Sequence, residues 1–244
     1  MPIDKKSIKA VVFDYGNTLI EFSPTQVMYC DMALSNALHR LFGKHDMETF
    51  KAIRARNRLA PYSLHPPEFK ENNMVEITTD LVRDLYGVEP SPEQLAELLR
   101  VRFDIFVRIV RAPDYVIPLL EKLGRKYRLG VLSNYPDGAA IRQSLAANKL
   151  DRYFQAVVVS ADLGLVKPHP VPFITILKQL RVGASEAVLI GDNWMGDIQG
   201  AHRAGLKAVF TSQWQSVENP PRQPGDTEPD ATISHLTQLE EFLL

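Results

Sequence analysis

The segment Ala10-Val-Val-Phe-Asp14-Tyr-Gly-Asn-Thr-Leu19 is a short apolar run that ends in a polar turn. An apolar run without alternation predicts a strand buried on both faces, as in a parallel sheet. Asp14 then follows the carboxyl end of that strand, where open α/β sheets bind their ligands. Taken alone, the segment is as typical of an ordinary turn as of a catalytic site. Its meaning depends on what the rest of the chain places beside it.

Apolar runs of the same kind recur in the second half of the chain. They cover residues 128–133, 156–160, 187–190 and 208–210, and amphipathic helical patterns lie near 138–149, 170–181 and 195–204. This alternation predicts an α/β fold with a doubly wound parallel sheet, that is, a Rossmann-like core. Residues 231–233 and 235–244 predict a final strand and helix.

The stretch from residue 21 to residue 108 breaks this alternation. It is rich in Leu, Ala, Glu and Arg at helical spacing and contains no convincing β-branched strand. Helices are predicted near 25–42, 46–60, 67–86 and 91–108, the last with Ser91 as its N-cap and Pro92 at the first helical position. We therefore expect an inserted α-helical cap domain (22–108) and a core domain made of 1–21 and 109–244. The polar, proline-rich segment 218–230 predicts a surface loop.

The composition excludes several kinds of partner. The 244 residues carry 28 Lys and Arg against 29 Asp and Glu, so no bulk positive field would attract nucleic acid or an anionic membrane. No segment approaches about 18 uninterrupted apolar residues. The single Cys30 rules out an internal disulfide framework. We expect a cytoplasmic protein, a monomer or a homodimer, whose function depends on local sites.

Polar residues also follow the next two predicted core strands. Ser133 and Asn134 end the second strand, and a Pro-Asp-Gly sequence then starts a helix, so the Ser133 hydroxyl can donate to an anionic oxygen. Lys167 follows the third strand and precedes a proline-initiated helix, where its ammonium could neutralise a carboxylate and a phosphoryl group. Each residue also has an ordinary interpretation, Ser133 as a helix N-cap and Lys167 as a solvated charge.

The fourth strand ends in Gly191-Asp192-Asn-Trp-Met-Gly-Asp197. Two carboxylates at a glycine-containing turn suit Mg²⁺, which prefers oxygen ligands and needs few protein carboxylates. A helix N-cap would explain one aspartate but not both. Asp14, Ser133, Lys167 and this acid pair all fall at the ends of successive core strands, and the convergence predicts a catalytic site.

With these residues the chain resembles the haloacid dehalogenase-like (HAD) hydrolase superfamily, in its helical-cap subgroup. The family pattern is matched at Asp14 with Thr18-Leu19, at Ser133-Asn134, at Lys167-Pro168, and at Gly191-Asp192 with Asp197. The resemblance spans residues 10 to 210, and most members of the superfamily are Mg²⁺-dependent phosphatases. It therefore implies a phosphoric monoester hydrolase with an inserted cap.

The mechanism implied by the resemblance has two steps, in which Asp14 attacks phosphorus and water then hydrolyses the aspartyl-phosphate. Lys167 and Ser133 would hold the transferring oxygens. Mg²⁺ would be bound by the Asp14 carboxylate, the main-chain carbonyl of Gly16 and Asp192, with Asp197 as a direct ligand or one step removed. Further candidates for binding the phosphate or the substrate are Asn134, Thr18, Asn17 and Arg58.

Gly16 departs from the family pattern. Phosphatases of the family usually carry a second Asp at this position, which protonates the leaving group and later activates water. General acid–base help is worth about 10²–10⁴ in rate. Three explanations remain open: a substrate with a good leaving group, a stand-in from the cap or from a water held by Asn17, or loss of strong catalysis. The carbonyl of Gly16 remains available for a metal.

Other functions are also compatible with these motifs. A carbon–halogen hydrolase of the same superfamily, acting on 2-haloacids, lacks the second Asp as well, but it works without Mg²⁺ and so leaves the acid pair unexplained. A signalling module phosphorylated on Asp14 and a catalytically weakened binding protein are further alternatives. A pocket closed by a cap favours a small phosphorylated metabolite as substrate. Arg54, Arg56 and Arg58 are candidates for choosing it, although a solvated helix face explains them too.

Overall fold

A parallel sheet forms the centre of the computed structural model, which describes residues 3–63, 66–214 and 222–244. The sheet has six strands in the order β3-β2-β1-β4-β5-β6, and all neighbouring strands are parallel. The strands are β1 (Ala10–Phe13), β2 (Arg128–Ser133), β3 (Ala156–Val159), β4 (Ala187–Gly191), β5 (Lys207–Thr211) and β6 (Ala231–Ile233). The α/β class and the doubly wound sheet predicted from the sequence are confirmed.

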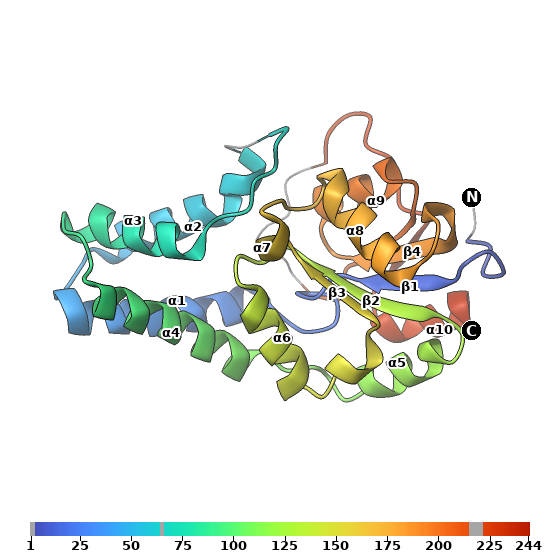
Figure 1. Cartoon of the computed structure of the whole chain (residues 1–244), viewed down its shortest axis with the longest axis horizontal. Coiled ribbons are helices and arrows are strands. Elements are labelled where there is room, and N and C mark those ends of the chain that lie inside the picture. The colour runs from blue at the N-terminus through green and yellow to red at the C-terminus, as the bar shows by residue number, and fades with distance from the viewer. Residues whose placement is uncertain (1–2, 64–65, 215–221) are drawn as a thin grey trace.

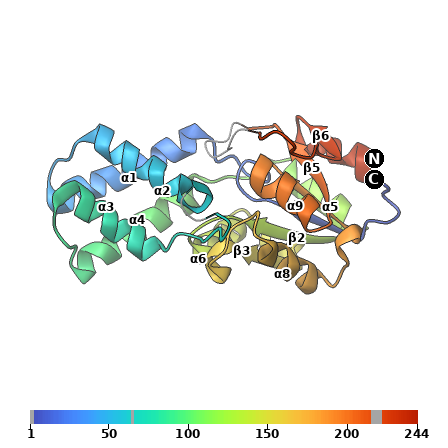
Figure 2. The ribbon, with the colours of Figure 1, turned by 90° about the horizontal axis from the view of Figure 1, so that it is seen from above.

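Helices cover both faces of the sheet (Figures 1 and 2). Successive residues of a strand face opposite sides, so Val11 and Phe13 pack in one apolar cluster, whereas Ala10 and Val12 pack in another. Helices on the first side are α5 (Val116–Gly124), α6 (Gly138–Ala147) and α10 (Leu239–Leu243). Helices on the second side are α8 (Pro170–Leu180) and α9 (Gly200–Arg203). The short α7 (Ser160–Leu163) follows β3 directly. Every central strand is therefore buried on both faces.

Four helices lie to one side of the sheet and pack mainly on one another (Figures 1 and 2). They are α1 (Pro24–Phe42), α2 (Met47–Ser63), α3 (Met74–Tyr86) and α4 (Pro92–Ile109). Their buried side chains form an apolar cluster separate from the two of the sheet, which includes Leu34, Leu38, Phe50, Leu81 and Leu98. The last turn of α4 joins the core through Phe106, which packs in the cluster on the α5 side of the sheet. The helical group is thus held to the sheet at its α4 end.

Some helices differ from the sequence predictions. The helix expected at 67–86 begins only at Met74, because the Asn73 side chain caps it by accepting from the N–H groups of Val75 (2.9 Å) and Glu76 (3.3 Å). The helix expected at 195–204 is a π-helix, Trp194–Gln199, continued by α9. The helix α5 was not predicted. Residues 218–221 of the expected surface loop lie outside the described residues.

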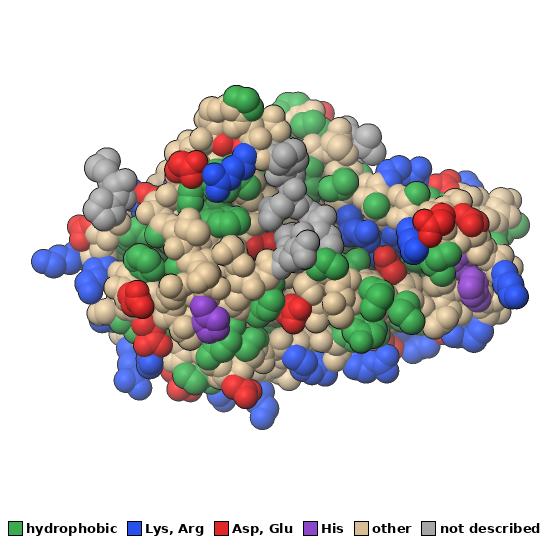
Figure 3. All heavy atoms as spheres, turned by 180° about the vertical axis from the view of Figure 1, so that it is seen from behind, with side chains coloured by type: hydrophobic (Ala, Val, Ile, Leu, Met, Phe, Trp, Pro, Cys, Tyr) green, Lys and Arg blue, Asp and Glu red, His purple; other side chains and the backbone are tan. Residues whose placement is uncertain are grey.

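The surface agrees with the balanced composition. Acidic and basic side chains are intermingled on the face seen in Figure 3. No helix in the described ranges is both long and apolar enough to cross a membrane.

Candidate active site

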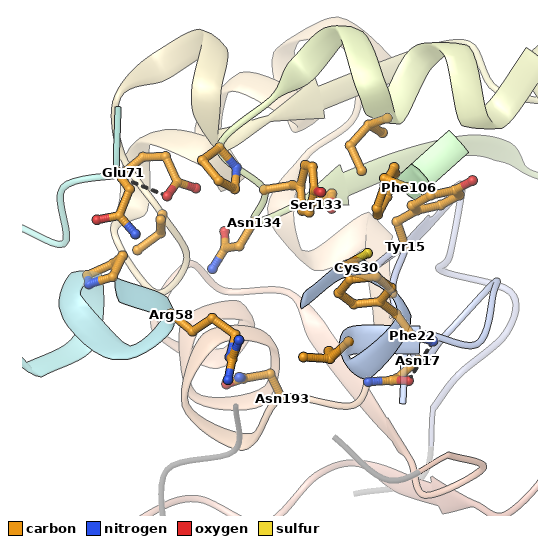
Figure 4. Close-up of a pocket in the computed structure, with 18 of the residues that line it drawn as sticks. Tyr15, Asn17, Phe22, Cys30, Arg58, Glu71, Phe106, Ser133, Asn134 and Asn193 are labelled. Atoms are coloured by element: carbon orange, nitrogen blue, oxygen red, sulfur yellow. Dashed lines mark hydrogen bonds between the residues drawn. The ribbon is translucent and has the colours of Figure 1, made fainter. Parts of the chain in front are cut away.

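Four of the predicted side chains meet at the carboxyl ends of the central strands. β1 lies between β2 and β4, so Asp14 after β1, Ser133 at the end of β2 and Asp192 after β4 become neighbours. Together with Lys167 they line one cavity of about 170 Å³, to which helices α1, α2, α3 and α4 also contribute side chains, and Figure 4 draws part of this lining. The topology therefore brings together residues that are far apart in the sequence.

Lys167 supplies a buried positive charge that pairs with two carboxylates of this cavity. Its side chain is 2% exposed, and Nζ donates to Asp14 Oδ1 at 2.7 Å, to Asp197 Oδ1 at 2.6 Å and to the Leu132 carbonyl at 2.7 Å. An ammonium has three N–H donors, and all three are used. Burial alone would lower the pKa of Lys167, but Asp14 and Asp197 outweigh it and raise the pKa. Lys167 is therefore a fixed positive charge.

The pKa of the Asp14 carboxyl is set by opposing effects. Burial raises its pKa to about 6 and Asp197 adds to the rise, whereas Lys167 opposes it. A carboxyl with this pKa is mostly ionised at pH 7 and above. Asp14 can therefore act as a nucleophile near neutral pH while most of its charge is hidden from water.

Asp197 is fully buried and both of its oxygens are engaged. Oδ1 accepts from Lys167, and Oδ2 accepts from the N–H of Asn193 at 2.9 Å. A Cβ on Gly191 would lie 2.2 Å from Oδ2, so only glycine allows this carboxylate to approach the end of β4. The contacts assign Asp197 to the positioning of Lys167 and of the turn after β4.

The acidic cluster fits the ligand preferences of Mg²⁺. Asp14, Asp192 and Asp197 each offer an oxygen within 4.8 Å of the others, and all three are buried. Mg²⁺ binds oxygens at about 2.1 Å, so two ligands on opposite sides of it lie about 4.2 Å apart. Both oxygens of Asp197 accept hydrogen bonds, whereas Asp14 accepts from Lys167 through Oδ1, so Asp14 and Asp192 are better suited to a metal. Gly16 lies in the turn after β1, two residues beyond Asp14, and lines the cavity, so its carbonyl is a further candidate ligand.

Two of the predicted phosphate-binding residues hold loops through their side chains, and a third is buried and is not among the described residues that line the cavity. Asn134 accepts from the Lys167 N–H at 2.8 Å, and its amide donates to the Lys167 carbonyl and to the Tyr62 hydroxyl, so it holds the lysine loop. Asn17 has a φ of 55°, and its Oδ1 accepts from the Phe22 N–H at 2.9 Å, which closes the turn after β1. Thr18 is 1% exposed and does not line the cavity formed by the described residues. The contacts of Asn134 and Asn17 are structural, and Thr18 Oγ1 has no hydrogen-bond partner among the described residues.

Hydrogen bonds of residues 69–71, which precede α3, join the helical group to the core. Val166 N–H donates to the Phe69 carbonyl at 2.8 Å, and Glu71 N–H donates to the Gly164 carbonyl at 3.0 Å. The Glu71 carboxylate also accepts from the Ser160 hydroxyl, and burial raises its pKa. These contacts flank the loop that carries Lys167, so closure of the cavity and placement of the lysine are linked.

Only two of the three predicted arginines lie at the cavity. Arg54 and Arg58 line the cavity, and Figure 4 shows Arg58 extending into it, whereas the exposed Arg56 pairs with Asp84 at 2.7 Å. Arg102 on α4 also lines the cavity and was not predicted. Its spacing from Leu98 and Phe106, four residues on either side, places it on the buried face of α4. That spacing was the signal in the sequence that could have identified it.

Comparison with known proteins adds to this geometry. Residues 80–211 match the model of a family described as haloacid dehalogenase-like hydrolase. One relative is a glyceraldehyde 3-phosphate phosphatase of Methanopyrus kandleri, 28% identical over 240 residues and 95% of each chain. A phosphoserine phosphatase of Thermus thermophilus is 32% identical over 150 residues, 61% of this chain and 57% of the relative. A solved 2-haloacid dehalogenase from Pseudomonas syringae has a TM-score of 0.73 at 29% identity, covering 97% of this chain and 98% of that one.

Proposed function

The chain belongs to the haloacid dehalogenase-like hydrolases, and we propose that it is a Mg²⁺-dependent phosphatase of small phosphorylated metabolites that uses Asp14 as its nucleophile. The observation that carries this proposal is the buried contact between Asp14 and Lys167, which lies beside a second carboxylate, Asp192. A nucleophilic carboxylate and a fixed cation in one cavity suit transfer of an anionic group. The named phosphatase relatives support the choice of phosphate.

In the first step, an oxygen of Asp14 forms a bond to phosphorus while the bond to the ester oxygen breaks. The ester oxygen leaves with the bonding electron pair, and the product is an aspartyl-phosphate on Asp14. Lys167 Nζ and the Ser133 hydroxyl, both on the wall of the cavity, donate to the oxygens of the transferring group. Asp197 and Leu132 hold two of the three N–H donors of Lys167 and keep the ammonium in place, and the N–H that it donates to Asp14 is the one that turns to the transferring group.

In the second step, water attacks phosphorus and the bond to Asp14 breaks, which releases phosphate and regenerates the carboxylate. Asp14, Asp192 and the Gly16 carbonyl would hold the metal, with Asp197 in support through Lys167. Bound Mg²⁺ supplies charge neutralisation, which lets an anionic nucleophile approach an anionic phosphate. The helical segment 22–108 serves as the cap, which closes the cavity and keeps bulk water out.

Because residue 16 is glycine, the site lacks the aspartic acid that usually protonates the leaving group. Among the described residues that line the cavity, Glu71 is the one carboxyl outside the motifs, and it is engaged by the Ser160 hydroxyl and the Asn72 N–H. The Asn17 amide oxygen is likewise engaged by Phe22. These contacts support the explanation in which the ester oxygen departs with little protonation. We therefore propose that the natural substrate has a good leaving group.

A carbon–halogen hydrolase is the second candidate, because the solved 2-haloacid dehalogenase is similar over nearly the whole chain. In that reaction Asp14 would displace halide from carbon, and water would then hydrolyse the alkyl ester on Asp14. The cluster of Asp14, Asp192 and Asp197 favours the phosphatase, since displacement of halide does not need a metal.

Dependence on metal separates the two candidates. We expect the purified protein to release phosphate from some members of a panel of phosphorylated metabolites with Mg²⁺, and the rate to fall by at least about 10²-fold in chelator, because the metal offsets several kcal/mol of charge repulsion. Added Mg²⁺ should restore it. Chloride release from chloroacetate is the parallel assay. Halide release that persists in chelator, without phosphatase activity, would reject the proposal in favour of the dehalogenase.

Gly16→Asp should change how the rate depends on the leaving group. A Cβ at position 16 would meet the Phe22 Cβ at 3.6 Å, an ordinary contact, so the site can accept a side chain. In the native protein, we expect kcat to rise steeply as the leaving alcohol becomes more acidic. Gly16→Asp should speed hydrolysis of alkyl phosphates by about 10²-fold or more and flatten the dependence, because it adds a general acid.

Gly16→Asn is the matched control, since it has nearly the same shape as Gly16→Asp but no carboxyl proton. It should leave the dependence as steep as in the native protein. A flat dependence in the native protein would instead indicate that another group already protonates the leaving oxygen.

A further inference from the structure

Three arginines of the helical group line the cavity together with the catalytic residues. Arg54 and Arg58 come from α2, and Arg102 comes from α4. The one carboxylate that pairs with them among the described residues is Asp31 on α1, which contacts Arg54 Nε at 2.8 Å and Arg58 Nη1 at 3.5 Å. Three guanidinium groups and one carboxylate leave a net positive charge on this part of the cavity.

Two of the guanidinium groups lack the hydrogen bonds that burial normally requires. The Nη1 atoms of Arg58 and Arg102 are buried and have no hydrogen-bond partner among the described residues, although the Arg58 atom keeps its 3.5 Å ion-pair contact with Asp31. No carboxylate of the described chain forms an ion pair with Arg102, and burial together with nearby Arg54 lowers its pKa to about 9. A buried cationic donor without a partner is costly, and an anion placed in the cavity would remove that cost.

The same cavity continues from these arginines to Asp14 and Lys167. A water molecule occupies about 10–15 Å³ of such a volume, so a cavity of about 170 Å³ has room for a molecule of roughly ten non-hydrogen atoms. A substrate that fills this cavity contacts both sets of residues. Lys167 is already paired with two carboxylates, Asp14 and Asp197. Arg102 forms no ion pair with a carboxylate of the described residues.

Deepening the proposed function, on which this inference rests, we propose that Arg102 and Arg58 bind a second anionic group of the substrate while its phosphoryl group lies at Asp14. The substrate is then a small phosphate monoester with a further carboxylate or phosphate a few bonds away. Asp31 contacts both Arg54 and Arg58 and so orients the two arginines of α2, and Arg54 is not the main contact. A guanidinium fork suits both anions, because each presents two oxygens in a plane.

Binding to the full chain carrying Asp14→Asn tests this without requiring turnover. The probes are ethyl phosphate, phosphoglycolate and ethylene glycol bisphosphate, which share a two-carbon skeleton and differ in the second group. By calorimetry with Mg²⁺, we expect at least one doubly anionic probe to bind about 10-fold to 10²-fold more tightly than ethyl phosphate, as charge-assisted hydrogen bonds allow. The two probes distinguish a carboxylate from a second phosphate.

Adding Arg102→Met should abolish this preference, and Arg102→Lys should restore part of it. Arg56→Met is the matched control, because Arg56 lies on the same helix as Arg58 but faces solvent, and it should keep the full preference. Equal binding of all three probes, no binding of any, or an equal weakening of all by Arg102→Met in a folded protein would overturn the inference. Tight selective binding without turnover in the native chain would instead count against the proposed phosphatase alone.

Discussion

Asp14→Asn is expected to lower kcat by at least about 10⁴-fold on every phosphate ester that the native protein hydrolyses, because it removes the nucleophile and leaves only binding and electrostatic stabilisation. An amide oxygen is a poor nucleophile and cannot form the aspartyl-phosphate. The fold should survive the change. Asparagine has nearly the same shape, Lys167 keeps its contact with Asp197, and a buried charge is removed. The loss of activity should therefore come without a loss of stability.

Steady-state kinetics, together with thermal unfolding of the same preparations, would measure this effect. Asp104→Asn makes the same chemical change at an exposed position of α4 and should leave kcat within about twofold, as surface changes usually do. Acid-quenched native protein should carry a phosphoryl group on the peptide that contains Asp14, and the variant should not. If Asp14→Asn retains a substantial share of the native rate, another residue must be the nucleophile.

The parts of this site that follow from strand order were predictable from the sequence. An uninterrupted apolar run such as β1 has few structural alternatives, and the residue after it must lie at the edge of the sheet. Asp14, Ser133 and Asp192 meet because β1 lies between β2 and β4. The motifs thus predicted which residues would be near one another, and the structure agrees on that point.

The roles that depend on hydrogen-bond partners were not predictable. Asn134 belongs to the Ser133-Asn134 motif and Asn17 lies in the turn after Asp14, but their side chains hold loops, because backbone N–H groups of Lys167 and Phe22 lie within reach. Nothing in the sequence near Asn134 or Asn17 specifies those partners, which come from other segments or from the turn geometry. Arg102 was missed for a related reason. A charged residue in an amphipathic helix is usually solvated, and although the spacing of Arg102 from Leu98 and Phe106 indicates the buried face of α4, tertiary packing decides that this face meets the cavity.

Lys167→Met is expected to damage both stability and catalysis. It removes the buried cation and leaves Asp14 and Asp197 facing each other without compensation. Breaking a buried ion pair by deleting one partner typically costs about 3–5 kcal/mol in the free energy of unfolding. We expect a loss of that size at pH 8 in chelator. Activity should fall by about 10³-fold, because a fixed donor to the transferring oxygens is lost as well.

The stability loss should depend on pH in a defined direction. In the native protein Lys167 opposes the rise in the pKa of Asp14, which burial brings to about 6. Without the lysine, the folded-state pKa of Asp14 rises further above its unfolded value of about 3.9. The folded variant then binds more protons than the unfolded chain, so its free energy of unfolding falls as pH increases. The difference from the native protein should be largest above pH 7, should shrink as the pH falls toward about 6, and should change little below that, where Asp14 is protonated in both folded proteins.

Urea unfolding of both proteins across this pH range, with chelator throughout, gives the required free energies. Lys178→Met removes a lysine from an exposed position of α8 and should change the free energy of unfolding by no more than about 0.5 kcal/mol at any pH. A loss in Lys167→Met that grows as the pH falls would contradict the argument, because unpaired carboxylates must become less costly when they are protonated. A loss independent of pH would indicate that packing of the lysine stem, and not its charge, stabilises the site.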